Sequence, residues 1–138
     1  MVYIRCDYVP FKKLGSYFTP EYKNLAKGLK GIITSISFSG HAGVLTNNID
    51  VACAGISAVA IGYSKAIATN CKLRSSVRAA KAGELDVKLL SIDANSLLWL
   101  IGLQSGLVLS LEAIKKEYPQ ACNIKWSSTE FFGFCSEL

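Results

Sequence analysis

Alternating hydrophobic and polar positions mark two strands in the first forty residues. VYIRCDYV (2–9) alternates, and GIITSISFSG (31–40) places Ile32, Ile36 and Phe38 on one apolar face. Between these runs, residues 10–30 are aromatic and basic, and they are interrupted by glycine and proline. We interpret this segment as an insertion between two strands, with a helix start at Thr19-Pro20-Glu21.

Two longer runs predict helices. Residues 49–70 are apolar almost all round and rich in alanine, so their length favours a helix that is buried on most faces. Residues 91–118 form the second candidate, with Asp93 or Asn95 as its cap. Its apolar stretch (97–111) is shorter than the roughly 18 residues that a membrane span needs, and Gln104 interrupts it. We therefore expect a core helix and no membrane partner.

The remaining segments complete the predicted sheet. Residues 77–90 indicate a hairpin around Ala82-Gly83, and residues 121–126 indicate a further strand. The aromatic tail (127–138) is expected to pack on the sheet or on a partner. Because few βαβ units alternate cleanly, we predict an α+β fold in a single domain (1–138). It has two layers, with a mostly antiparallel sheet packed against two long apolar helices.

Composition agrees with one globular domain and narrows its chemistry. The chain has 138 residues, of which 51% are hydrophobic and 18% are charged. Its five cysteines are widely spaced without a CxxC pair, so we expect no disulfide framework, no metal site and no cofactor. The N-terminus has no apolar core of a secretory signal, which predicts a cytoplasmic protein.

The net charge of +5 is uneven along the chain. Residues 1–31 carry six basic and two acidic side chains, and residues 72–88 carry five and two. This distribution is typical of ordinary solubility or of work close to RNA, for example at a ribosome. We favour ordinary solubility, because the sequence has no RGG-like or aromatic-plus-basic RNA motif.

The chain's single histidine suggests a catalytic pair with a cysteine. His41 follows the second predicted strand, and Cys53 comes twelve residues later. If the helix begins near Asn47 or Asn48, Cys53 lies in or just after its first turn, where the helix N-terminus favours a thiolate. The intervening segment is long enough to bring the imidazole beside the sulfur, which supplies a nucleophile and a base for acyl transfer.

Two polar residues share the helix face of Cys53, at helical spacing before and after it. Asp50 either orients His41 or caps the helix. Ser57 either donates a hydrogen bond within the site or bonds back to the Cys53 carbonyl. A purely structural interpretation also stands, because cysteine in an alanine-rich helix commonly packs and histidine beside glycine is often a turn residue.

The same stretch resembles the signature of the ribosomal-processing cysteine protease (Prp) family. The matching segments are Gly40-His41-Ala42-Gly43 and Asp50-Val51-Ala52-Cys53-Ala54-Gly55-Ile56-Ser57-Ala58, and the likeness spans roughly residues 31–126. Two features depart from the pattern. Residues 10–30 exceed the tight hairpin expected there, and Asn48 stands where the family has glycine. Asparagine tolerates left-handed backbone angles better than other non-glycine residues.

The resemblance implies a fold, an activity and a site. It implies an α+β homodimer and an endopeptidase that removes a short N-terminal extension from a large-subunit ribosomal protein precursor, with ribosomal RNA nearby. It makes Cys53 the nucleophile and His41 the general base, with Asp50 and Ser57 in support and with loop residues Gly40, Gly43 and Asn48. The alternatives are a non-catalytic ribosome-associated or assembly factor on the same scaffold, and a plain dimeric module with a redox-sensitive thiol.

Overall fold

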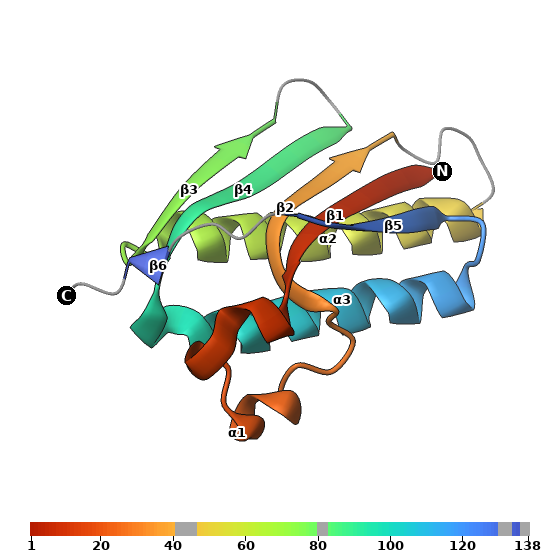
Figure 1. The fold of residues 1–138 in the computed structure, drawn as a ribbon. Helices are drawn as coiled ribbons and strands as arrows, with labels where there is room; N and C mark the ends of the chain where they lie inside the picture. The colour runs from red at the N-terminus through yellow and green to blue at the C-terminus, as the bar shows by residue number, and fades with distance from the viewer. Residues whose placement is uncertain (41–46, 80–82, 130–133, 136–138) are drawn as a thin grey trace.

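The computed structural model describes residues 1–40, 47–79, 83–129 and 134–135, and it shows one mixed sheet covered on one face by two long helices (Figure 1). The strand order is β3-β4-β2-β1-β5. β1 pairs antiparallel with β2 and parallel with β5. This arrangement confirms the predicted two-layer α+β fold. The strands are β1 (Val2–Pro10), β2 (Gly31–Ser39), β3 (Leu73–Arg78), β4 (Glu84–Asp93), β5 (Cys122–Ser128) and a short β6 (Phe134–Cys135) paired with β4.

The helices α2 (Asn47–Thr69) and α3 (Leu97–Glu117) run antiparallel on the same face of the sheet (Figure 1). By length and composition alone, both are apolar enough to cross a membrane. In this fold each helix instead buries one side against the sheet, through Ile56 and Ile67 of α2 and Leu100 and Leu111 of α3. Removal of these side chains from water, at about 25 cal/mol per Å², is the main force that holds the two layers together.

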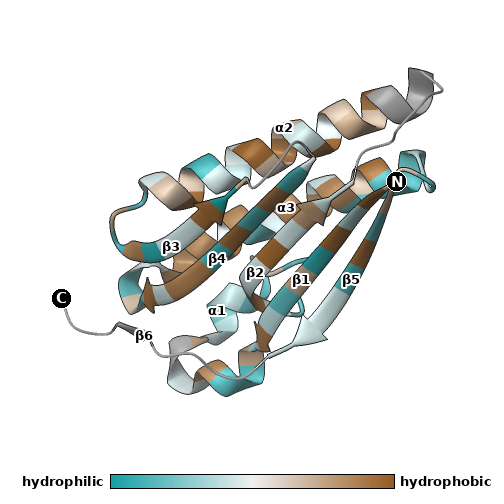
Figure 2. Ribbon diagram, turned by 90° about the horizontal axis from the view of Figure 1, so that it is seen from above, coloured by the Kyte–Doolittle hydropathy of each residue, from teal (hydrophilic) through white to brown (hydrophobic). Residues whose placement is uncertain are grey.

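Alternation along the strands explains why only one face of the sheet is covered. In β1, Val2, Ile4 and Cys6 are buried under the helices, whereas Tyr3 and Arg5 are exposed. Figure 2 shows the resulting bands of hydrophobic and hydrophilic residues along β1 and β2. A strand with one apolar side needs one covering layer, so the opposite face of the sheet remains polar.

The second helix begins later than the sequence indicates. Residues 91–93 belong to β4, and a short 3₁₀ turn, η2 (Ala94–Ser96), precedes α3. The Asp93 carboxylate caps this turn by accepting a hydrogen bond from the Asn95 backbone N–H at 3.1 Å. The predicted start at 91 is wrong because the β3–β4 register shifts near Leu90. This bulge puts Leu89 and Ile92 on the same buried face, so β4 continues to Asp93 although the alternation of its side chains is broken near Leu90.

The segment between β1 and β2 packs on α3. It contains a 3₁₀ helix, η1 (Phe11–Tyr17), and a one-turn helix, α1 (Pro20–Lys23). The rings of Phe11 and Phe18 stack at 4.3 Å, and Tyr22 meets Phe18 edge-on at 6.0 Å. The Ser105 hydroxyl of α3 donates to the Lys27 carbonyl at 2.6 Å. These aromatic rings therefore serve local packing.

Gln104 is fully buried between the helices and the sheet. Its side-chain oxygen accepts from the Ile33 backbone N–H at 2.8 Å, and its amide donates to the Ile33 carbonyl at 2.8 Å and to the Tyr63 hydroxyl at 3.1 Å. The β2–β4 ladder reaches only to Ser35, so Ile33 lies beyond its end. Gln104 thus takes the place of a neighbouring strand for this one residue of β2.

Candidate active site

Cys53 is positioned by the second turn of α2. The helix begins at Asn47, so Cys53 lies just after the first turn, where backbone N–H groups already bond within the helix. The electrostatic effect of a helix terminus falls off within its first turn. Helix-end stabilisation of the thiolate is therefore minor at Cys53, and any strong activation has to come from a neighbouring side chain.

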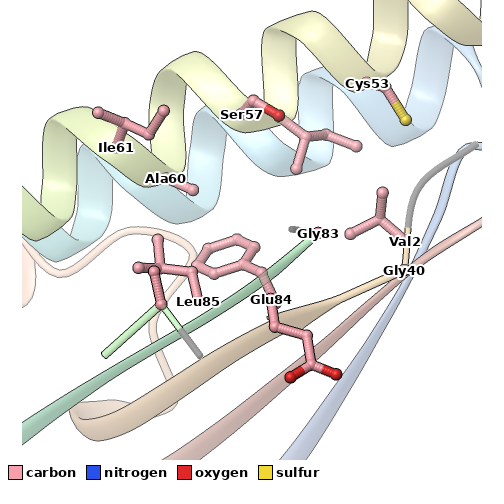
Figure 3. Close-up of a pocket in the computed structure, with 12 residues that line it drawn as sticks. Val2, Gly40, Cys53, Ser57, Ala60, Ile61, Gly83, Glu84 and Leu85 are labelled. Atoms are coloured by element: carbon pink, nitrogen blue, oxygen red, sulfur yellow. The ribbon is translucent and has the colours of Figure 1, made fainter. Parts of the chain in front are cut away.

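The Cys53 side chain is half-buried and lines a cavity of about 430 Å³ between α2 and the sheet. Ser57, one turn further along α2, and Gly40, where the chain leaves β2, line the same cavity. Figure 3 shows the Cys53 sulfur on the side of α2 that faces the sheet, above Val2 and Gly40. A thiol at the mouth of a hollow can meet a bound molecule, which a core thiol cannot.

The rest of the cavity wall is mostly apolar. It is formed by side chains from β1, β2, α2 and β4, namely Val2, Phe38, Ile56, Ala60, Ile61 and Leu85. An apolar hollow with a few polar groups at one end is the usual form of a small-molecule or peptide side-chain site. This cavity is therefore suited to hold an apolar side chain close to the Cys53 sulfur.

Gly40 fixes the point at which the chain leaves β2. Its φ of +86° lies in the left-handed region, and an added Cβ would stand 2.7 Å from the Met1 carbonyl oxygen. Both constraints require glycine at this position. Since His41 is the next residue, the backbone before the histidine is set by this close approach to the N-terminal strand.

Replacing Gly40 with alanine tests that constraint. We expect Gly40→Ala to lower the free energy of unfolding by about 1–3 kcal/mol, because the new methyl group meets backbone that cannot move aside. The neighbouring Ser39→Ala is the matched control, with a change within about 0.5 kcal/mol. Urea unfolding of both variants gives the comparison. Equal stability of the two variants would show that Gly40 is not constrained.

The structure brings together some of the residues predicted for the site. Cys53, Ser57 and Gly40 share the cavity. Asn48 and Asp50 lie in the first turn of α2, but their side chains are outside the described residues. His41 and Gly43 also lie outside them. Contact between His41 and Cys53 therefore stays a prediction from the sequence, and the position of Gly40 at the cavity is compatible with it.

Sequence reasoning missed the contribution of the β3–β4 hairpin. Ala79, Gly83, Glu84 and Leu85 all line the cavity. Glu84 pairs with Ser39 in the β2–β4 ladder, which places the hairpin beside the exit of β2. Its carboxylate points away from α2 in Figure 3, so Glu84 is not positioned to act on the sulfur. No local motif marks these residues, because long-range strand pairing brings them to the site.

The other described cysteines differ from Cys53. Cys6 and Cys122 are buried, and burial raises the pKa of Cys6 to about 12. Burial also raises the pKa of Cys122, while Lys115 lowers it and Cys53 raises it by smaller amounts. Cys71 is exposed in the turn after α2. In the described part of the chain, no cluster of His, Cys, Asp and Glu resembles a metal site.

Comparison with known proteins identifies the family. The family model for the cysteine protease Prp matches residues 23–123, well over half of the chain. A search of curated proteins gave no match.

Solved structures share the fold. The essential ribosomal processing protease Prp from S. aureus, in complex with a covalently linked product peptide, aligns with a TM-score of 0.63 at 22% identity, over 92% of this chain and 100% of that chain. The complex of the same protease with a substrate peptide aligns with a TM-score of 0.64 at 21% identity, with the same coverage of both chains. SMU.848 from Streptococcus mutans gives 0.66 at 18% identity, over 94% of this chain and 96% of that chain. The family match and the cavity around Cys53 lead to one assignment: this chain belongs to the Prp family of cysteine proteases.

Proposed function

We propose that this protein is a cysteine endopeptidase that removes a short N-terminal extension from a large-subunit ribosomal protein precursor. The observation on which the proposal depends is the position of Cys53: its sulfur faces a cavity that is also lined by Gly40, the residue before His41. Membership of the Prp family and the likeness to a ribosomal processing protease support the choice of substrate. Since such precursors are made by cytoplasmic ribosomes, we place the protein in the cytoplasm.

In the proposed mechanism, the His41 imidazole takes the proton from the Cys53 thiol. The thiolate attacks the carbonyl carbon of the scissile peptide bond, and a tetrahedral intermediate forms. The C–N bond then breaks, the leaving amine takes the proton from the imidazolium, and a thioester remains on Cys53. Water, deprotonated by His41, hydrolyses the thioester and releases the new carboxyl end. Asp50 and Ser57 are proposed as supporting residues, Asp50 toward His41 and Ser57 within the cavity that it shares with Cys53.

The cavity walls suggest how a peptide is held. Their apolar side chains accept an apolar residue of the extension, and burying it positions the neighbouring carbonyl near the sulfur. The S. aureus relative was solved with a covalently linked product peptide. We propose the same kind of covalent step at Cys53.

We also propose that the protein is a homodimer that associates through its helical layer. On the side of α2 and α3 turned away from the sheet, several exposed residues are apolar or small, namely Val51, Ala58, Gly62, Leu98, Gly102 and Gly106, and Lys65 is exposed beyond them. A groove of about 380 Å³ runs between the two helices along this face. Exposed apolar surface of this kind commonly marks a protein interface.

Light scattering after size-exclusion chromatography tests the dimer. We expect twice the chain mass of 14.9 kDa for the wild type and the monomer mass for Leu98→Lys. Leu90→Lys is the matched control, because Leu90 is also half exposed but lies on β4, outside the helical layer. A wild-type monomer at micromolar concentration would contradict the proposal, as would dissociation by both variants alike.

Cleavage of a defined precursor tests the proposed activity. A large-subunit ribosomal protein that carries its N-terminal extension is incubated with the purified protein, and the new N-terminus is read by mass spectrometry. We expect one cut for the wild type and at least about a hundredfold slower cleavage for His41→Ala, which lacks the general base. If the wild type binds the precursor without cutting it, the non-catalytic assembly factor becomes the better assignment.

A further inference from the structure

A second hollow lies at the edge of the sheet that β5 forms. Its volume is about 420 Å³, and it lies between the end of α3 and the edge strand β5, two strands beyond β2. We call it the α3–β5 hollow. Its lining residues are Glu112, Lys115, Lys116, Pro119, Ile124 and Trp126.

The α3–β5 hollow combines an aromatic ring with several cations. Trp126 is half-buried in its wall, and the Lys30 ammonium lies 5.6 Å from the centre of the Trp126 ring. Tyr8 meets the same ring edge-on at 5.8 Å and helps to fix its orientation. Lys115 and Lys116 line the hollow, and Glu112 is the acidic side chain among its lining residues. The local charge is therefore positive.

The lysines continue as a strip along α3. The segment 27–30 runs along α3: the Ser105 hydroxyl donates to the Lys27 carbonyl, and Gly28 lies against Leu109. Lys30 follows two residues later. From Ser105 to Lys116 the helix rises about 16 Å, which is the span of two to three nucleotides of an extended single strand. Lys27, Lys30 and Lys116 are exposed along this strip.

We propose that the α3–β5 hollow binds single-stranded RNA, with a base stacked against Trp126 and phosphates paired with Lys30, Lys115 and Lys116. Aromatic platforms flanked by lysine are the usual means of binding single strands without sequence preference. The choice of RNA over DNA rests on the proposed function at a ribosomal precursor. Because the hollow and the Cys53 cavity share no lining residue, RNA and substrate peptide can be held together. RNA bound in the α3–β5 hollow would tether the protease to the ribosomal particle that contains its substrate.

Fluorescence anisotropy with a labelled, unstructured twelve-nucleotide RNA tests the proposal. We expect the logarithm of the association constant to fall with the logarithm of salt concentration with a slope of about −2, at about −0.7 for each of three phosphates. The double variant Lys30→Gln/Lys116→Gln should flatten the slope by about 1.4 and weaken binding at least about fivefold. The matched control Lys65→Gln/Lys72→Gln has the same net charge at the far end of α2, and it should change binding less than about twofold.

Stacking has its own readout. In a Trp99→Phe background, Trp126 is the remaining tryptophan of the chain, so its fluorescence should be quenched when RNA binds. An unchanged signal with RNA bound contradicts a stacked base. If the two double variants weaken RNA binding equally, the α3–β5 hollow is not the binding site. If the wild type does not bind RNA near 0.1 M salt, the whole proposal is wrong. Tighter binding of DNA of the same sequence, or equal displacement by a polyglutamate peptide, overturns RNA as the partner.

Cleavage of a short precursor peptide, measured on the same preparations, separates this inference from the proposed function. Both double variants should cleave at the wild-type rate, because none of the four lysines lines the Cys53 cavity. Loss of RNA binding with cleavage retained supports the tether. A wild type that binds RNA and does not cleave contradicts the peptidase proposal alone.

Discussion

Cys53→Ala is expected to lose at least about 10⁴-fold in cleavage rate while the protein stays folded. The activity disappears because a methyl group cannot attack a carbonyl carbon, whatever the other groups of the site do. The fold survives because Cys53 is only half-buried and the substitution removes one sulfur atom, at a cost of about 1 kcal/mol. Rates on the precursor and urea unfolding of the same sample measure the two effects separately.

Cys71→Ala is the matched control for Cys53→Ala. It removes a thiol that is exposed in the turn after α2, at the other end of that helix from Cys53. We expect wild-type cleavage from this variant. A cleavage rate of Cys53→Ala within tenfold of the wild-type rate would contradict the assignment of Cys53 as the nucleophile. A comparable loss of rate in Cys71→Ala would contradict it too.

Gln104→Leu is expected to destabilise the fold by about 3–5 kcal/mol, a large part of the 5–15 kcal/mol of a typical domain. Leucine is an apolar side chain of similar size to glutamine, although it branches one atom earlier. It leaves the Ile33 N–H, the Ile33 carbonyl and the Tyr63 hydroxyl without the partner that they have in the structure. Each unsatisfied buried polar group costs about 1–3 kcal/mol. Urea or thermal unfolding measures the loss.

Ser105→Ala provides the comparison for Gln104→Leu. Its hydroxyl makes one hydrogen bond, to the Lys27 carbonyl, so its removal should cost about 1 kcal/mol. If Gln104→Leu costs no more than Ser105→Ala, Gln104 does not complete the edge of β2. The sequence shows Gln104 only as an interruption in an apolar run, and its partner lies 71 residues away in the chain.

Local periodicity predicted the elements that have one apolar side. The alternation in β1 and β2 and the apolar lengths of α2 and α3 were sufficient for the α+β class, because each pattern has a single way to bury its hydrophobic side chains. Prediction failed where tertiary structure breaks the period. The bulge near Leu90 hid the end of β4, and the start of β3 at Leu73 lies in a run of polar residues.

In the candidate site, too, some residues could be predicted from local sequence and others could not. A sequence motif identified Cys53 and Gly40, since a helix start after a glycine-flanked strand exit is a local feature. The apolar wall from Leu85 and the hairpin glycine at 83 could not be predicted, because they reach the cavity through the pairing of β2 with β4. Nor did any local signal indicate that Trp126 and Lys30 meet, almost a hundred residues apart in the chain.

The most direct test of the proposed dyad is the rate at which Cys53 is alkylated as a function of pH, read residue by residue by mass spectrometry. Exposed Cys71 serves as the reference within the same molecule. The proposed dyad predicts that alkylation of Cys53 reaches half its maximum well below the value of about 8.5 for an ordinary thiol, and that His41→Ala moves this midpoint upward. A midpoint at or above 8.5 in the wild type, unchanged in His41→Ala, would contradict it.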